Sequence, residues 1–213
     1  MTMDMLESGT RPERDYDLER LIMLSDGVFA IAITLLAIEL RPPPGWDGHI
    51  ASLRDRMSDD LVTYLVSFVT VATYWIMHRR SFRYLVASDA VLTLLNFSVL
   101  GLITLLPFAT RLTADAPATA EAAGLYVGLI AAIGVATAAQ WAWAAFPGRL
   151  LRPGLTLRFR LYVALTLLFV PAMTSAFSAL SSTTGRGWLM WLIAVFWVGL
   201  TWFRRRFVGK MPR

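Results

Sequence analysis

One carboxylate stands inside an apolar stretch of this chain. Asp26 lies near the start of the run 21–40, whose other charged residue is Glu39, at the far end. If this run crosses a membrane, an ionisable group within it costs at least about 2.5 kcal/mol unless it is paired or hydrated. Asp26 is therefore either a functional residue or an anchor that hydrogen-bonds a neighbouring helix.

Helical spacing gives the same run distinct faces. At about 100° per residue, Ile31, Leu35 and Ile38 fall within about 60° of one another and form a single apolar stripe. Asp26 lies about 140° away from Ile31 and points elsewhere, so its partner must come from another helix or another subunit. His78 is a candidate partner, because it directly follows the second apolar run and lies at a comparable depth.

The composition places these residues in a membrane protein. The chain has 213 residues, of which 56% are hydrophobic and 16% are charged. Soluble domains carry about a quarter charged residues, and a transmembrane helix needs about 20 apolar ones. We therefore predict an all-α integral membrane protein with six transmembrane helices. The six apolar runs are 21–40, 61–77, 90–110, 122–146, 161–180 and 188–203.

Basic residues predict the orientation of these runs. Of the 20 Lys and Arg residues, 15 fall at the two termini and in the second and fourth loops, which lie on one side of the membrane. Cytoplasmic loops are enriched in Lys and Arg, so both termini are predicted to be cytoplasmic in a multi-pass protein of the plasma membrane. The predicted parts are a cytoplasmic N-terminal segment (1–19), a six-helix domain (20–207) and a cytoplasmic tail (208–213).

The sequence argues against several classes of function. There is no cysteine, so thiolate metal sites and thiol catalysis are excluded. The two histidines fall on opposite sides of the membrane, so no metal site, cofactor or enzymatic cluster is expected. The net charge of +5 follows from the arginines at helix ends, and no nucleic-acid partner is expected. The charged segment 49–60 could form a short surface helix before the second span.

The first run also carries a family resemblance. Arg20 is followed by a Ser-Asp-Gly motif at 25–27 and by the apolar segment 29–39. This pattern resembles the first-helix signature of the transmembrane protein 175 family, which comprises endolysosomal potassium channels and smaller bacterial relatives. Leu24 stands where the family usually has an aromatic residue, and this is expected to loosen the packing around the motif. Further matches to the family are Tyr74, Trp75, His78, Asn96 and the segment 105–108.

The resemblance implies a potassium-selective cation channel. It implies a homotetramer of six-helix subunits, with the first helices central and lining the pore. By position, Ile31, Leu35 and Ile38 would form an apolar constriction, and Thr34 would offer a hydroxyl to a partly dehydrated potassium ion. The resemblance also implies a structural polar network that holds the first two helices in register. Its members would be Arg20, Ser25, Asp26, Trp75 and His78.

The alternative is a proton-coupled secondary cation transporter that uses Asp26 and His78. Transporters often have interrupted helices in both halves and ionisable groups near the bilayer midplane. Here the ionisable pair lies towards the cytoplasmic end, which favours the channel.

No Thr-Val-Gly-Tyr-Gly filter is present, so a ring of backbone carbonyls of that kind cannot supply selectivity. An aliphatic ring can instead gate by dewetting, in a pore that oligomerisation encloses within the lipid bilayer.

Overall fold

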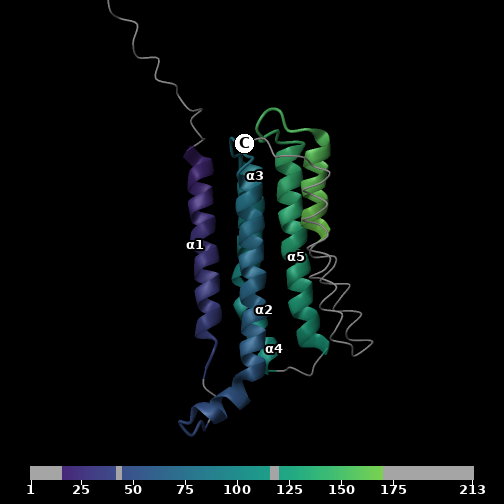
Figure 1. The fold of residues 1–213 in the computed structure, drawn as a ribbon. Coiled ribbons are helices and arrows are strands. Elements are labelled where there is room, and N and C mark those ends of the chain that lie inside the picture. The colour runs from purple at the N-terminus through teal and green to yellow at the C-terminus, as the bar shows by residue number, and fades with distance from the viewer. Residues whose placement is uncertain (1–15, 42–44, 116–119, 170–213) are drawn as a thin grey trace, which may run out of the picture.

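The fold is a bundle of long helices that run side by side (Figure 1). The structure, a computed structural model, describes residues 16–41, 45–115 and 120–169. A further helix begins at residue 157 and continues to the end of the described part, at 169. The named helices are α1 (Tyr16–Ile38), α2 (Ile50–Phe82), α3 (Ala90–Thr104), α4 (Leu106–Asp115) and α5 (Ala120–Ala145).

The helices of the described part confirm the prediction of an all-α membrane protein. Four segments are long and apolar enough to cross a membrane, and they coincide with the first four predicted runs. The predicted fifth run lies partly within the helix at 157–169, and the sixth lies outside the described residues. Residues 1–15 and the tail 208–213 also lie outside them. The four segments are Tyr16–Ile38, Asp60–Phe82, Ala90–Asp115 and Glu121–Ala145.

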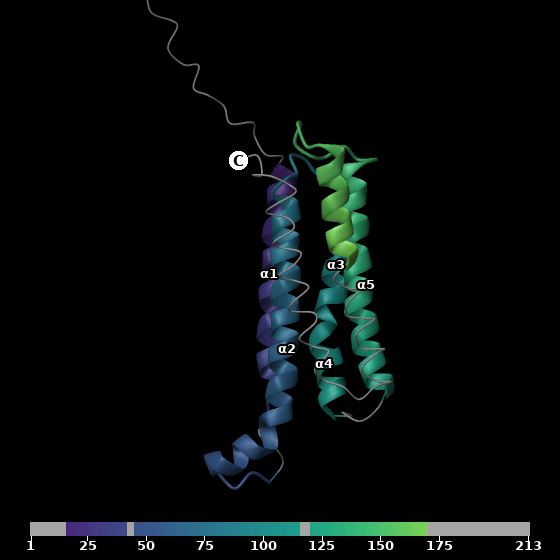
Figure 2. The ribbon, with the colours of Figure 1, turned by 45° about the vertical axis from the view of Figure 1, so that its right-hand side comes forward.

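The helix α2 is longer than its apolar run. It begins at Ile50 and continues unbroken to Phe82, so the helical segment predicted at 49–60 forms, as the first turns of α2 and not as a helix of its own. The reason is that neither proline nor glycine occurs between these two residues to end the helix. Its first turns bend away from the long axis of the bundle (Figure 2).

The third predicted run is two helices, α3 and α4, that meet at Leu105. Pro107 has no backbone N–H and cannot continue the hydrogen-bond ladder of α3. At the end of α3 the Leu105 N–H donates to the Leu102 carbonyl, three residues back, at 3.2 Å. The normal spacing of four residues returns where the Ala109 N–H donates to the Leu105 carbonyl at 3.0 Å. The span therefore contains a break close to the end where α1 finishes.

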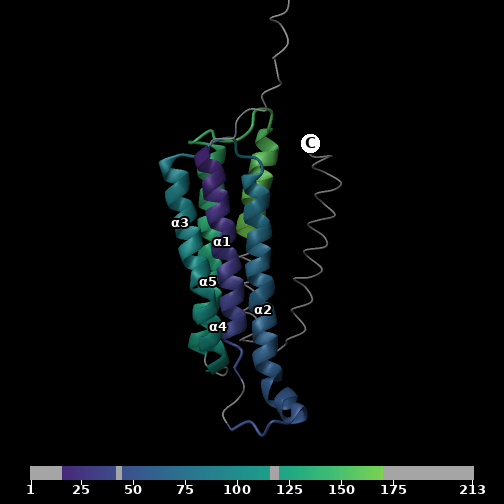
Figure 3. The same cartoon turned by 90° about the vertical axis from the view of Figure 1, so that its left-hand side faces the viewer.

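One helix, α1, lies at the edge of the bundle. It packs against α2 and α3, and α5 lies beyond them (Figure 3). The buried residues of α1 recur at helical spacing and include Leu18, Ser25, Phe29 and Leu36. The opposite face of α1 is left uncovered by the described part of the subunit.

Two apolar clusters fill the bundle, one above the other. On α1 the first contains Leu18 and Leu21, and the second contains Phe29, Ala32 and Leu36. Members of both clusters also come from α2, α3 and α5. Between the two clusters each of these four helices contributes a buried polar residue, so a polar layer separates the two apolar clusters.

Candidate functional site

Asn96 is the centre of this polar layer. Its amide Nδ2 donates to Ser25 Oγ at 2.9 Å, and its Oδ1 accepts from Gln140 Nε2 at 2.9 Å. The same Oδ1 lies 2.8 Å from His78 Nε2. Because an amide oxygen only accepts, His78 carries its proton on Nε2. One asparagine therefore joins α1, α2, α3 and α5, and it is fully buried.

Aromatic rings fix the position of His78 within the layer. Its imidazole stacks on the Phe82 ring with centroids 4.0 Å apart, and the Phe29 ring lies 5.6 Å away. Ser25 is held in turn, because its Oγ donates to the Leu21 carbonyl of its own helix at 2.7 Å. Asn96 and Gln140 are thus hydrogen-bond partners that join different helices.

Asp26 makes a separate contact between α1 and α2. Its Oδ1 accepts from Trp75 Nε1 at 2.8 Å, and the side chain is exposed in the single subunit. The prediction that His78 is its direct partner is wrong, because His78 bonds Asn96. Neighbouring residues on a helix point about 100° apart, so Asp26 reaches the edge of α1 when Ser25 faces the interior.

Arg20 does not join the polar layer in the described part of the chain. It is exposed, and its guanidinium carbon lies 5.6 Å from the centroid of the Tyr16 ring on its own helix. The five residues of the predicted network thus fall into three sets. Ser25 and His78 belong to the layer, Asp26 bonds Trp75, and Arg20 packs on Tyr16.

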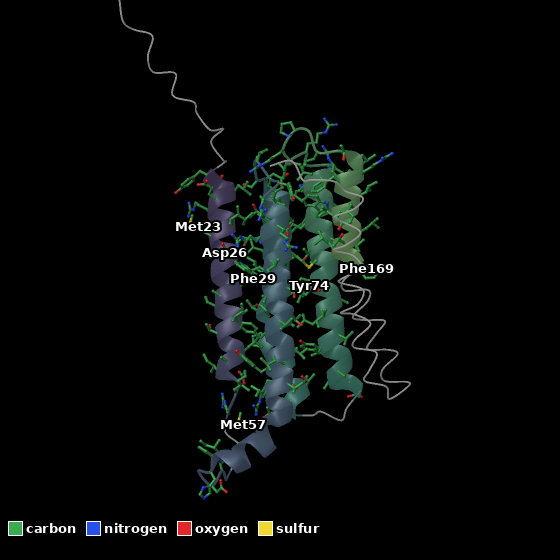
Figure 4. All side chains as sticks on the ribbon, viewed as in Figure 1. Met23, Asp26, Phe29, Met57, Tyr74 and Phe169 are labelled. Atoms are coloured by element: carbon green, nitrogen blue, oxygen red, sulfur yellow. The ribbon has the colours of Figure 1, made fainter. Side chains whose placement is uncertain are left out.

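The predicted stripe lies on the uncovered face of α1. Ile31, Leu35 and Ile38 are 58%, 39% and 61% exposed, whereas Phe29 on the opposite side is 1% exposed. Figure 4 shows Phe29 directed into the bundle. Thr34 is also exposed, and its hydroxyl donates to the Ile31 carbonyl at 2.8 Å. The Thr34 oxygen therefore keeps its lone pairs free to accept from the outside.

Asp89 joins α3 to α5 at the end of the bundle where α1 begins, opposite to the end that carries Ile38. It is the N-cap of α3 and accepts from the Leu92 N–H at 2.6 Å. It also accepts from Trp143 Nε1 of α5 at 3.0 Å. Its carboxylate is thus occupied by structural bonds.

Sequence reasoning missed a second polar cluster. Ser67 Oγ lies 2.8 Å from Thr110 Oγ1 and 3.0 Å from Tyr126 OH, so three hydroxyls tie α2, α4 and α5 together. Tyr74 OH donates to the Ile130 carbonyl at 2.8 Å. Serine and threonine in spans more often bond their own backbone, so residue type alone gave no signal for this cluster. No group of three or more His, Cys, Asp or Glu side chains that could hold a metal occurs among the described residues.

Comparisons with known proteins find one protein family. The family model described as endosomal/lysosomal potassium channel TMEM175 matches residues 20–107. A potassium channel of Chamaesiphon minutus is 34% identical over 139 residues, which are 62% of this chain and 68% of that protein. A potassium channel of Streptomyces collinus is 32% identical over 57% of this chain and 62% of that protein. The human endosomal/lysosomal proton channel TMEM175 is 27% identical, over 24% of its own length.

A solved structure is similar over a larger part of the fold. It is the crystal structure of a lysosomal potassium-selective channel TMEM175 homolog from Chamaesiphon minutus, with a TM-score of 0.66 and 27% identity. The superposition covers 89% of this chain and 97% of that chain. The similarity of fold therefore extends beyond the segment that the family model matches.

Proposed function

The chain belongs to the TMEM175 family, and we propose that it is a potassium-selective channel whose pore is lined by α1. Ile31, Leu35 and Ile38 form the apolar constriction in this proposal. Because the family consists of channels, the chain is not an enzyme. The observation that carries the proposal is the uncovered aliphatic stripe on a helix whose opposite face is buried.

The uncovered face of α1 is aliphatic but is accompanied by two polar residues. Asp26 lies at its edge and Thr34 lies on it, and an ionisable group within a span is costly unless it is paired or hydrated. Water or another subunit would cover this face at lower cost. One pore-lining helix cannot enclose a pore by itself, so the proposal requires a homo-oligomer, and the family resemblance favours a tetramer.

An aliphatic ring can select ions through the cost of dehydration. When its radius is smaller than a hydrated ion tolerates, the ring dewets and the pore closes. Potassium sheds water more readily than sodium, so a narrow apolar ring favours potassium modestly. The free lone pairs of Thr34 could replace part of the lost hydration on the same face.

The polar layer holds the pore helix in place in this proposal. It fixes the inner face of α1 to α2, α3 and α5, while the bond from Trp75 to Asp26 fixes its edge. The arginine-rich loops lie at the end of the bundle where α1 begins, which supports cytoplasmic termini in a plasma-membrane protein (Figure 1).

Ion flux into liposomes that hold the purified protein tests the proposal. Potassium flux down its own gradient, with sodium as the comparison ion and without a proton gradient, is expected. Flux that requires an imposed proton gradient would support the proton-coupled transporter instead. Equal flux of potassium and sodium would support a channel that does not select between the two ions.

The contact between α1 and α2 can be tested by substitution of Asp26. Asp26→Ala is expected to lower the stability of the assembled protein by about 1–2 kcal/mol, because the Trp75 indole N–H loses a charged acceptor. The ion preference of the remaining channels should stay unchanged. The measurement is the thermal midpoint of the detergent-solubilised oligomer by size-exclusion chromatography, with permeability ratios from reversal potentials.

A double-mutant cycle gives this prediction its control. Trp75→Phe removes the donor and keeps the ring, so the double variant should lose little more than either single one. Glu19→Ala, an exposed carboxylate on the same helix, should leave the midpoint unchanged. A stable Asp26→Ala oligomer with a changed ion preference would instead place Asp26 in the permeation path.

A further inference from the structure

Arg111 joins the end of α1 to the short helix α4. Its Nη1 donates to the carbonyl oxygen of Glu39 at 3.3 Å. Its Nε and Nη2 contact the two oxygens of Asp115, one turn further along α4, at 3.0 and 2.8 Å. The carboxylate therefore fixes the plane of the guanidinium, and the remaining donor points at α1.

The end of α1 needs such a donor. The last carbonyls of a helix lack partners within the helix and carry the negative end of its dipole. The last turn of α1 contains no basic residue of its own. The chain leaves the helix through bonds from the Glu39 N–H to Leu35 and from the Leu40 N–H to Ala37, both at 3.2 Å. Arg111 supplies a hydrogen bond at this point from a different span.

The bond lies next to the outermost residue of the stripe. Glu39 directly follows Ile38, which is 61% exposed on the uncovered face. Arg111 itself belongs to α4, which the break at Leu105 separates from α3. We infer that Arg111 is a positioning residue that holds the outer end of the pore helix against α4 and so keeps Ile38 in place in the constriction. This inference rests on the proposed function.

The Arg111–Asp115 pair also suits the mouth of a cation pore. A lone arginine there would repel the permeant ion, whereas a paired one gives the hydrogen bond without net charge. The arginine and aspartate side chains are 38% and 57% exposed, so solvent reaches both. Removing Asp115 alone would thus leave an unpaired positive charge at this end.

Reversal potentials of the full-length channel in planar bilayers test the inference. Arg111→Gln is expected to lower the potassium-to-sodium permeability ratio at least threefold, because the end of α1 is released. Arg111→Lys should recover part of the ratio, since an ammonium keeps the charge but cannot bond Asp115 and Glu39 with the same fixed geometry. Asp115→Asn should reduce the single-channel conductance at low salt and less so at high salt.

Two further variants separate the possible causes of failure. Arg41→Gln removes the same charge at the same end of α1 without touching the Arg111 bonds, and it should keep the wild-type ratio. Ile38→Asn should lower the ratio if the constriction is correctly proposed. A wild-type ratio in Arg111→Gln beside a lowered one in Ile38→Asn overturns the inference alone. Wild-type ratios in both overturn the constriction and the inference together.

A readout that needs no ion current completes the test. The chain has no cysteine, so Arg41→Cys can carry a single spin label just beyond the end of α1. Arg111→Gln is expected to increase the mobility of this label in the electron paramagnetic resonance spectrum, and Arg111→Lys should increase it less. Unchanged mobility in Arg111→Gln would show that the bond does not hold the end of α1. If Arg111→Gln fails to assemble, the same comparison is made with Arg111→Lys.

Discussion

Replacing Ile31 or Leu35 by asparagine is expected to raise the potassium current several-fold and to bring the potassium-to-sodium permeability ratio close to one. Both side chains stand on the uncovered face of α1, where an amide would hold water in a ring that otherwise dewets. A wetted ring no longer forces an ion to lose its hydration, so the barrier falls for both ions. The measurement is single-channel current and reversal potential in planar bilayers.

The control for this prediction is another exposed leucine. Leu94 lies on α3 and is 67% exposed, so Leu94→Asn introduces the same amide on a different helix. It should leave current and permeability ratio at their wild-type values. If Ile31→Asn and Leu35→Asn also behave as wild type, the stripe is not part of the pore, and the uncovered face of α1 must serve packing between subunits or contact with lipid.

The sequence was sufficient to predict the faces of α1. Helical periodicity grouped Ile31, Leu35 and Ile38, and the structure leaves all three exposed on one side of the subunit. The lengths of the apolar runs located the first four spans, since an apolar run of span length has few alternatives to a helix in a membrane. What the periodicity could not give is the identity of what covers that face.

The partner of Asp26 could not be predicted from depth alone. His78 was at a suitable height, but Trp75 lies about one turn earlier on α2 and presents its N–H to the edge of α1. His78 faces the interior, where Asn96 offers an acceptor from a third helix. Deciding between the two required the rotation of α2 about its own axis, and packing sets that rotation.

Contacts near the break in the third span were also beyond prediction. Pro107 is visible in the sequence, but proline within a span can bend a helix or end it. The break places α4 so that Arg111 meets the end of α1 and Thr110 meets Ser67. Both contacts join residues that are far apart in the chain and ordinary in type, so no local pattern indicates them.

Replacing Asn96 by leucine is expected to destabilise the subunit more than any other single change proposed above. The leucine would fill a similar volume but leave the His78 and Gln140 N–H groups without their acceptor in a buried site. Hydrogen bonds between helices in membranes average about 0.6 kcal/mol each, and a buried donor left unpaired costs about 1–3 kcal/mol. With two such donors, a loss of at least about 2 kcal/mol follows, measured as a lower thermal midpoint and a reduced yield of oligomer.

A graded series on the same residues identifies the polar layer as the cause. Gln140→Leu removes one of the three bonds to Asn96 and should fall between Asn96→Leu and wild type. Ser98→Ala is the matched control on α3, because Ser98 is exposed and bonds the Leu94 carbonyl of its own helix at 3.0 Å. A midpoint for Asn96→Leu no lower than that of Ser98→Ala would mean that the apolar clusters alone hold the four helices together. The layer would then have to be explained by specificity of packing, because a buried polar group that adds no stability can still select one alignment of the helices over others.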